Sequence, residues 1–166
     1  MAGRLGHLSP CGLTIAFGRV ITVVGVGADG WAGLSAGARR RVEKADVVIG
    51  GRRHLPILPQ RPGQRRQPWS SPLREHLPGF LAHLGDGTIV ALASGDPLVS
   101  GIGTTLIDLL GSDHVVIEPA VSSVAVARAR MGWPEETCAV VSLVGRDVSL
   151  LRRELAPGRR VIVLSS

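Results

Sequence analysis

The segment around which the chain is organised is Ala91-Leu-Ala-Ser94-Gly95-Asp96-Pro97-Leu98-Val99-Ser100-Gly101-Ile-Gly103. It begins inside an apolar run, residues 88–93, whose shortness and β-branched start predict a buried strand of a parallel sheet. Residues 104–110 follow with apolar side chains at helical spacing. The Ser-Gly-Asp-Pro turn therefore lies where a strand ends and a helix begins, at the edge of an α/β sheet where ligands bind.

The rest of the chain alternates in the same way between short apolar runs and helical patterns. Strands are predicted over residues 19–24, 46–50, 114–118, 139–143 and 160–164, and helices over 34–45, 74–84, 124–131 and 149–155. The helix of residues 34–45 has Leu34, Ala38, Val42 and Ala45 on one face. Residues 56–72 are interrupted by prolines and predict a surface connection without an element. The order predicts an α/β fold with a mostly parallel sheet flanked by helices.

The composition is that of an ordinary globular domain with a basic balance. Hydrophobic residues make up 45% of the 166 residues, and 19 basic against 13 acidic residues give a formal charge of +6. Lys44 is the single lysine, so the charge is almost all arginine, whose planar fork suits carboxylates and phosphates. A codon bias toward arginine explains the excess of arginine equally well. Aromatic residues at 3% disfavour a nucleic-acid binder that stacks on bases.

The cysteines, the length of the apolar runs and the order of the predicted elements predict the localisation and the domain boundaries. Cys11 and Cys138 are far apart and match no metal spacing, so we expect no metal site and a reduced, cytoplasmic setting. No apolar run is long enough to cross a membrane. Residues 1–18 predict a disordered extension or an early start codon. We expect an N-terminal α/β domain over 19–118 and the start of a second, incomplete α/β domain over 119–166, since nothing follows its last apolar strand.

A glycine-rich turn, Gly25-Val-Gly27-Ala28-Asp-Gly30, follows the first strand. It matches the G-x-G-x-x-G spacing of dinucleotide-binding proteins, but the second strand ends without the acidic residue that would hold a ribose. Asp46 begins that strand and would lie at the wrong edge of the sheet. The turn therefore indicates either a tight chain reversal or the close approach of a ligand to its backbone.

The end of the second strand carries Arg52, Arg53 and His54. This cluster is either a solvated charged loop or a site for a polycarboxylate, and its place at a strand end favours the second interpretation. Ser122 and Ser123 precede a helix and could serve as its cap, which is compatible with offering hydroxyl groups to a ligand. No serine or cysteine lies in a nucleophile–base pattern, so a hydrolytic triad is not expected.

Taken in order, these motifs resemble the tetrapyrrole methylases. The resemblance rests on Val23-Val-Gly-Val-Gly-Ala-Asp-Gly, Val48-Ile-Gly-Gly-Arg-Arg-His-Leu, Leu92-Ala-Ser-Gly-Asp-Pro-Leu and Pro119-Ala-Val-Ser-Ser, and it runs from about residue 20 to the end. Within that family the sequence is most similar to the branch that contains the precorrin-6Y C5,15-methyltransferases and cobalt-precorrin-7 C5-methyltransferases of cobalamin biosynthesis.

The resemblance implies a two-domain α/β enzyme that binds S-adenosyl-L-methionine between its domains and methylates carbon atoms of a precorrin macrocycle. The residues that it assigns to the cofactor are Ala28, Ser94, Gly95, Asp96, Val99, Ser122 and Ser123. Those assigned to the substrate are Gly27, Arg52, Arg53 and His54, and no catalytic residue is assigned. A homo-oligomer, and a partner domain or protein that methylates C15 and decarboxylates, are left open.

Two departures and three alternatives accompany this expectation. Ser100 stands where the family commonly has an aromatic residue, and the family's second domain continues well past residue 164. The alternatives are another methylase of the family, acting on uroporphyrinogen or on a diphthine precursor, a truncated non-catalytic binding fragment, and a basic nucleic-acid binder. The dispersed arginines and scarce aromatic residues disfavour the last of these.

Overall fold

The computed structural model describes residues 18–70 and 72–165 of the chain. They form two compact units, one that ends at Ala120 and one that begins at Val121, and each is described by itself. Residues 1–17, on which most of the predicted extension falls, lie outside the described residues. The assignment of residues 19–118 and 119–166 to separate domains stays a prediction.

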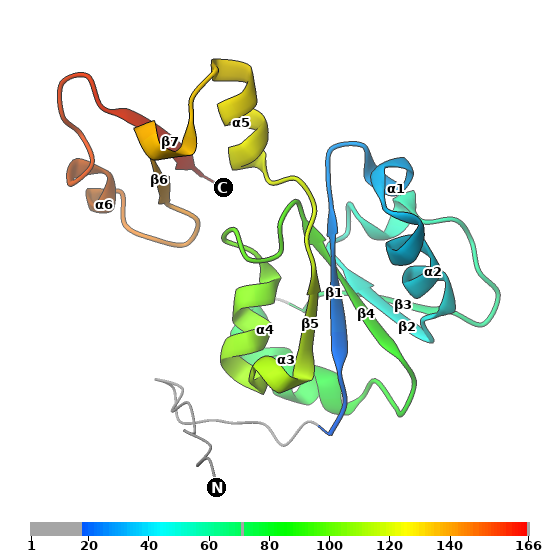
Figure 1. Ribbon diagram of the computed structural model, residues 1–166. Coiled ribbons are helices and arrows are strands. Elements are labelled where there is room, and N and C mark those ends of the chain that lie inside the picture. The colour runs from blue at the N-terminus through cyan, green and yellow to red at the C-terminus, as the bar shows by residue number, and fades with distance from the viewer. Residues whose placement is uncertain (1–17, 71, 166) are drawn as a thin grey trace, which may run out of the picture. The chain divides into compact units, whose positions relative to one another are not determined.

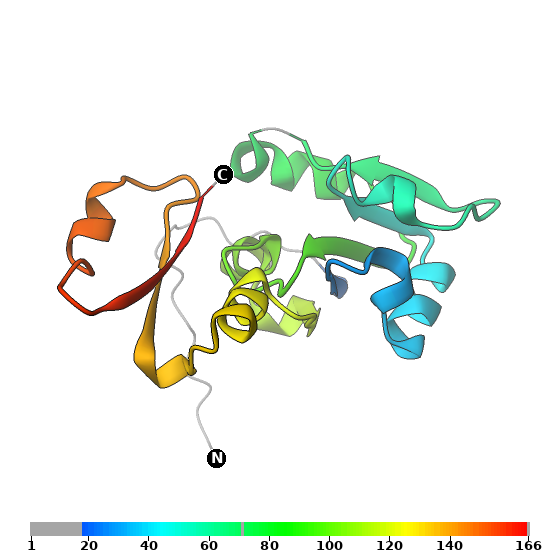
Figure 2. The same ribbon diagram turned by 90° about the horizontal axis from the view of Figure 1, so that it is seen from above.

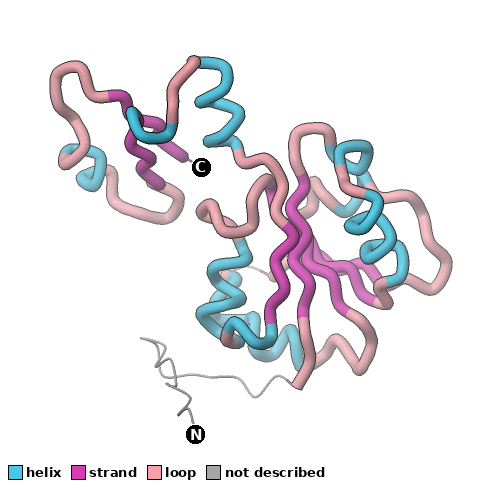
Figure 3. Tube along the Cα trace, in the orientation of Figure 1, coloured by secondary structure: helices cyan, strands magenta, loops and turns pink. Residues whose placement is uncertain are grey.

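A five-stranded sheet with the order β3-β2-β4-β1-β5 forms the centre of the first unit, and every neighbouring pair is parallel (Figure 1). The strands are β1 (Ile21–Val26), β2 (Val47–Gly50), β3 (Arg65–Pro68), β4 (Ile89–Ser94) and β5 (Val115–Glu118). Because they all run in one direction, the loops that follow them emerge at one edge of the sheet (Figure 3).

Helices cover both faces of this sheet, as the sequence predicts (Figure 2). The helices are α1 (Gly30–Gly33), α2 (Ala36–Lys44), α3 (Leu73–Ala82) and α4 (Ile102–Leu110), with short 3-10 turns η1 (Leu55–Ile57) and η2 (Ser112–His114). Buried leucines of α3 and α4 pack on one face, and Ala38 and Val42 of α2 pack on the other.

The core is apolar throughout because the central strands are buried from both sides. Ile21 and Val23 of β1 face the α3–α4 side, and Val24 faces the α2 side, each at 0–1% exposure. Leu106 of α4 is fully buried. Truncating such a leucine to alanine removes apolar contacts and leaves a cavity, at a cost of about 2–5 kcal/mol.

The predicted face of α2 is confirmed. Leu34, Ala38, Val42 and Ala45 are all buried in one cluster. The helix itself starts at Ala36, later than predicted, because Ser35 is its cap and accepts a hydrogen bond from the Ala38 amide at 3.0 Å.

The prediction that residues 56–72 hold no element is wrong. They contain part of η1 and the whole of β3, which pairs in parallel with β2. The Arg65 amide donates to the Asp46 carbonyl at 2.9 Å, and the Trp69 amide to the Gly50 carbonyl at 3.1 Å. Because β3 is an edge strand, it tolerates charged residues and a terminal proline, Pro68, and so lacks the apolar pattern of a central strand.

The second unit contains α5 (Ser123–Met131), η3 (Glu135–Thr137), β6 (Cys138–Ser142), α6 (Ser149–Arg152) and β7 (Arg160–Leu164). Strands β6 and β7 pair in parallel, with Val140 opposite Ile162. Helix α6 ends before the predicted residue 155.

Candidate functional site

The candidate site of the first unit is built from the loops that follow β1, β2 and β4, at the carboxyl edge of the sheet (Figure 3). These strands are neighbours in the order β2-β4-β1, so their loops are neighbours too. Ser94 ends β4, and the loops hold the other predicted residues of this edge, which are Gly27, Ala28, Arg52, Arg53, His54, Gly95, Asp96 and Val99.

The turn after β4 is held in shape by its own backbone and by Asp96. The Asp96 carboxylate accepts a hydrogen bond from the Leu98 amide at 2.8 Å through Oδ1, and its carbonyl accepts one from the Val99 amide at 3.1 Å. Ser94, the last residue of β4, is exposed, whereas Asp96 is half-buried. The turn thus presents a hydroxyl group and a carboxylate whose orientation is fixed by the chain.

Gly25 brings the β1 and β4 ends together. A Cβ atom on Gly25 would lie 2.3 Å from the Gly95 carbonyl oxygen and 2.7 Å from the Ala120 nitrogen. The Gly95 amide, in turn, donates to the Val26 carbonyl at 2.7 Å, and Gly95 has a φ of 60°. At Gly25 the close approach is therefore made by the chain's own backbone, which favours a tight chain reversal at this position of the turn.

The segment after the turn is packed tightly onto the start of α4. A Cβ atom on Gly101 would lie 2.6 Å from the Pro97 carbonyl oxygen, and one on Gly103 would lie 2.8 Å from it. The Gly103 amide donates to that same oxygen at 3.1 Å. Ser100, between them and the turn, has a φ of 52°, a left-handed conformation that is unusual for serine. Such backbone strain is common where a loop is held for a ligand.

Arg53 links the loop after β2 to the turn after β4. Its Nη2 donates a hydrogen bond to the Ser94 hydroxyl oxygen at 3.2 Å, and the side chain is otherwise exposed. A residue predicted to bind substrate thus contacts one predicted to bind the cofactor. Arg52 is also exposed in this loop.

His54 is half-buried in the same loop, and its amide donates to the Gly51 carbonyl at 2.9 Å. Its Nδ1 is buried without a hydrogen-bond partner among the described residues. Burial, and next the neighbouring Arg53 charge, lower the pKa of His54 below its usual range. The imidazole is therefore neutral at physiological pH and can accept a hydrogen bond or a proton.

The turn after β1 is open. The Gly30 amide donates to the Gly27 carbonyl at 3.1 Å, and Gly30 has a φ of 57°. Among the described residues, none beyond its chain neighbours has an atom within 4 Å of the position that a Cβ atom on Gly27 would take, and Ala28 is exposed. This turn leaves space beside its backbone, in contrast to the crowded Gly25.

Ser122 and Ser123 belong to the second unit and are described within it. Ser122 caps α5, and its hydroxyl oxygen accepts a hydrogen bond from the Ala125 amide at 3.0 Å. The predicted capping role is confirmed. Ser123 is the first residue of α5, and its side chain is exposed.

Sequence reasoning missed two contributions to this edge of the sheet. The unrecognised β3 places Trp69 and Ser70 after its carboxyl end, and the Ser70 hydroxyl is buried without a partner among the described residues. The ring centroids of Trp69 and Phe80 are 6.0 Å apart, and Trp69 packs against the core of the α3–α4 face. Leu98 of the β4 turn is 51% exposed and adds an apolar surface beside Asp96.

A family model for the tetrapyrrole (corrin/porphyrin) methylases matches residues 20–166. The precorrin-6Y C(5,15)-methyltransferase [decarboxylating] of a Sinorhizobium species is 40% identical over 146 residues, which are 88% of this chain and 35% of that protein. The cobalt-precorrin-7 C(5)-methyltransferase of Salmonella typhimurium is 35% identical over 146 residues, 88% of this chain and 71% of that protein. The chain thus spans about a third of the first relative's length.

Solved structures agree with the family match. The precorrin-6Y methylase of Archaeoglobus fulgidus aligns with a TM-score of 0.65 and 25% identity, over 89% of this chain and 73% of that one. The uroporphyrin-III C-methyl transferase of Thermus thermophilus, complexed with S-adenyl homocysteine, aligns with a TM-score of 0.53 and 26% identity, over 77% of this chain and 58% of that one. No helix among the described residues is long and apolar enough to span a membrane. With its parallel sheet, its loops at the carboxyl edge and a match over residues 20–166, this chain belongs to the tetrapyrrole methylases.

Proposed function

We propose that the chain is part of an S-adenosylmethionine-dependent methyltransferase that methylates C5 of a precorrin macrocycle, with C15 as a further position, in cobalamin biosynthesis. The names of the relatives support this reaction. The structural observation that supports it is the hydrogen bond between Arg53 and Ser94. That bond couples the loop with the arginines to the turn proposed to hold the cofactor. Cytoplasmic location, a homo-oligomer and a C15-methylating, decarboxylating partner belong to the same proposal.

The residues of the β4 turn fit S-adenosylmethionine. Asp96 uses Oδ1 for the Leu98 amide, and its Oδ2 accepts no hydrogen bond from a described residue. A carboxylate held in this way suits an ammonium group or a ribose hydroxyl. Ser94 and Ser123 offer exposed hydroxyl groups, and the backbone at Gly27 leaves room for close approach. The solved neighbour that is complexed with S-adenyl homocysteine supports the same cofactor class.

The chain's own residues act by binding and alignment. S-Adenosylmethionine supplies, when bound, a methyl group already activated by its sulfonium. Asp96 and Ser94 hold that ligand at a fixed place, and Arg52 and Arg53 bind carboxylates of the substrate. Holding two reactants in line replaces a bimolecular encounter, which accounts for much of an enzyme's rate enhancement. Replacement of a ring hydrogen by a methyl group releases a proton, and neutral His54, whose Nδ1 has no hydrogen-bond partner among the described residues, is a group on this edge that can accept it.

Isothermal titration calorimetry with S-adenosylhomocysteine tests the cofactor site. The purified chain should bind it, and Asp96→Ala should weaken binding about tenfold, since one charge-assisted hydrogen bond is lost. Asp86→Ala, which removes an exposed carboxylate from a distant turn, is the matched control and should bind like the wild type. Wild-type affinity in Asp96→Ala would refute the assignment.

The substrate is tested separately. Precorrin-7-type and uroporphyrinogen-type macrocycles are offered to the same preparation, and methylated products are followed by mass spectrometry. Methylation of the precorrin alone supports the C5 reaction. Methylation of uroporphyrinogen alone points to another branch of the family. A thermal shift with short RNA but none with S-adenosylhomocysteine would instead support the nucleic-acid alternative.

A further inference from the structure

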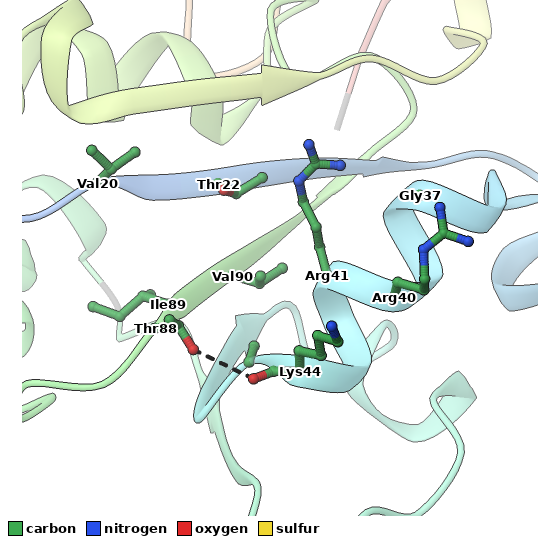
Figure 4. Close-up of a pocket in the computed structure, with 10 residues that line it drawn as sticks. Val20, Thr22, Gly37, Arg40, Arg41, Lys44, Thr88, Ile89 and Val90 are labelled. Carbon is green, nitrogen blue, oxygen red and sulfur yellow. Dashed lines mark hydrogen bonds between the residues drawn. The ribbon is translucent and has the colours of Figure 1, made fainter.

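A pocket lies on the α2 face of the sheet, away from the loops of the proposed active site. It is a pocket of about 510 Å³ between α2 and the first residues of β1 and β4 (Figure 4). Figure 4 shows Arg40, Arg41 and Lys44 on the α2 side, and Val20, Thr22 and Val90 on the sheet side. Gly37, Ala45, Thr88 and Ile89 complete its lining.

The pocket is separate from the carboxyl edge of the sheet. Val90 of β4 lines the pocket and Ser94 ends the strand, so the two are four residues apart, or about 13 Å along an extended chain.

The apolar surface of the sheet continues beyond the pocket, where Val20 and Val116 are 50% and 45% exposed. Val116 pairs with Thr22, so its side chain lies on the same face of the sheet. A ligand here therefore meets an apolar floor.

The rim of the pocket is cationic. Arg40 and Lys44 are exposed, and neither forms an ion pair with a described residue. Arg41 pairs with Glu118 of β5, which neutralises it. Two other acids near the rim are also engaged: Glu43 of α2 pairs with Arg61, and Asp46 accepts hydrogen bonds from the Thr88 amide and hydroxyl at 2.7 and 2.8 Å. Two positive charges therefore remain at the mouth of an apolar pocket whose acidic neighbours are already engaged.

Gly37 keeps the pocket open on the α2 side. The nearest atom to a Cβ at this position, among the described residues, would be the Arg41 Nη1 at 3.6 Å, which is ordinary contact. No crowding and no left-handed φ requires glycine here. In a helix glycine is less favourable than alanine by roughly 0.5–1 kcal/mol. Gly37 therefore destabilises α2 although the packing around it does not require a glycine.

We propose that this pocket binds an amphipathic small molecule, with an apolar body on Val20 and Val90 and an anionic head, a carboxylate or a phosphate, at Arg40 and Lys44. Cations with long aliphatic stems suit such a ligand, because the stems extend the apolar wall while the charges face the head group. This site is independent of the proposed methyl transfer, since none of its residues belongs to the loops of that site.

Fluorescence titration with 1-anilinonaphthalene-8-sulfonate, an apolar ring system with one anionic group, tests the charges. The double variant Arg40→Gln, Lys44→Gln should raise the Kd about fivefold, since two exposed charge contacts are lost. The matched control is Arg152→Gln, Arg153→Gln, which removes two exposed arginines of the second unit and should leave the Kd unchanged. Octanoate and octyl phosphate then compete in separate arms, which tells a carboxylate ligand from a phosphate ligand.

Gly37→Leu tests the volume of the pocket without removing a charge. A Cβ atom at this position meets no crowded atom, and glycine is a poor helix former, so the melting temperature should stay the same or rise, while the affinity for the dye should fall by a similar factor. S-Adenosylhomocysteine binding should not change in any of these variants, which separates this site from the proposed function. Dye affinity that is unaffected by both the double variant and Gly37→Leu would overturn the proposal.

Discussion

At the scale of single residues, Gly25 and Gly27 have opposite environments although they belong to one motif. We predict that Gly25→Ala lowers the free energy of unfolding by about 2 kcal/mol, because its Cβ would collide with backbone atoms of Gly95 and Ala120. Gly27→Ala is the matched control, and its stability should stay within about 0.5 kcal/mol of the wild type, since nothing lies near the new atom.

Urea unfolding, followed by circular dichroism, measures both variants. Equal stability of Gly25→Ala and the wild type would contradict the packing argument. Gly27→Ala also has a second readout, because a ligand that approaches this backbone would be obstructed by the added methyl group. Weaker binding of S-adenosylhomocysteine or of substrate, at unchanged stability, is the result expected for that variant.

Arg52 and Arg53 are neighbours in sequence with different contacts. Charge reversal of either, Arg52→Glu or Arg53→Glu, should raise the KM for a precorrin substrate about tenfold, because carboxylates of the substrate lose a cation and meet a like charge. Only Arg53→Glu should also weaken S-adenosylhomocysteine binding, since Arg53 alone bonds to Ser94. Calorimetry and steady-state kinetics on both variants check this. An unchanged KM in both would remove the arginines from the substrate site.

The contact between Arg53 and Ser94 could not be predicted from the sequence, although the motifs predict a site role for each of the two residues. The apolar runs show where strands end, and parallel strands end at one edge. They do not show the strand order, which makes β2 and β4 neighbours here, nor the path of a loop. The lack of a hydrogen-bond partner for His54 Nδ1 among the described residues and the left-handed conformation of Ser100 also depend on loop paths, so the sequence could not predict them.

At the scale of elements, the starts of β2 and β4 are joined by Asp46 and Thr88. Hydrogen bonds from the Thr88 amide, and next from its hydroxyl, lower the pKa of Asp46 below its usual range. The folded state therefore favours the carboxylate. Its contribution is fully present above about pH 4, where the unfolded chain is also ionised, and is lost as the pH falls through the lower pKa of the folded state.

Thr88→Val removes the hydroxyl and tests this effect. The stability difference between wild type and Thr88→Val should be larger at about pH 6 than at about pH 2.5, because protonation of Asp46 at low pH weakens the interaction in the wild type. Thr104→Val, at an exposed position of α4, is the control and should show no such dependence. A Thr88→Val difference that does not change with pH would contradict the role of Asp46.

Elements with buried faces were predictable, and the edge element was not. The run that becomes β4 is apolar because both of its faces are covered, and α2 shows its buried face at helical spacing. Strand β3 has a single hydrogen-bonded neighbour and consists of Arg65-Arg-Gln-Pro68, so hydrophobicity carries no signal for it. Its evidence lies in backbone pairing with β2, which only the three-dimensional structure reveals.

At the scale of the whole molecule, the two compact units differ in how much they bury. The first has a sheet covered on both faces, whereas the described part of the second has a two-stranded sheet and only Val124 and Val141 as buried hydrophobic residues. An isolated pair of strands is marginally stable in water. We predict that amides of β6 and β7 exchange hydrogen about a hundredfold faster than those of β1 and β4. Equal protection in a hydrogen-exchange experiment would contradict this.

Hydrogen exchange in the presence of S-adenosylhomocysteine also tests whether both units contribute to the cofactor site. Binding adds stability to every segment that must be ordered for it, so exchange should slow at residues 94–99 and at the start of α5, where Ser122 caps the helix and Ser123 exposes its hydroxyl. Ser123→Ala, which keeps the cap, should bind more weakly and reduce the protection of α5. Protection confined to residues 94–99, with wild-type affinity in Ser123→Ala, would show that the first unit alone binds the ligand and would remove the serine pair from the site.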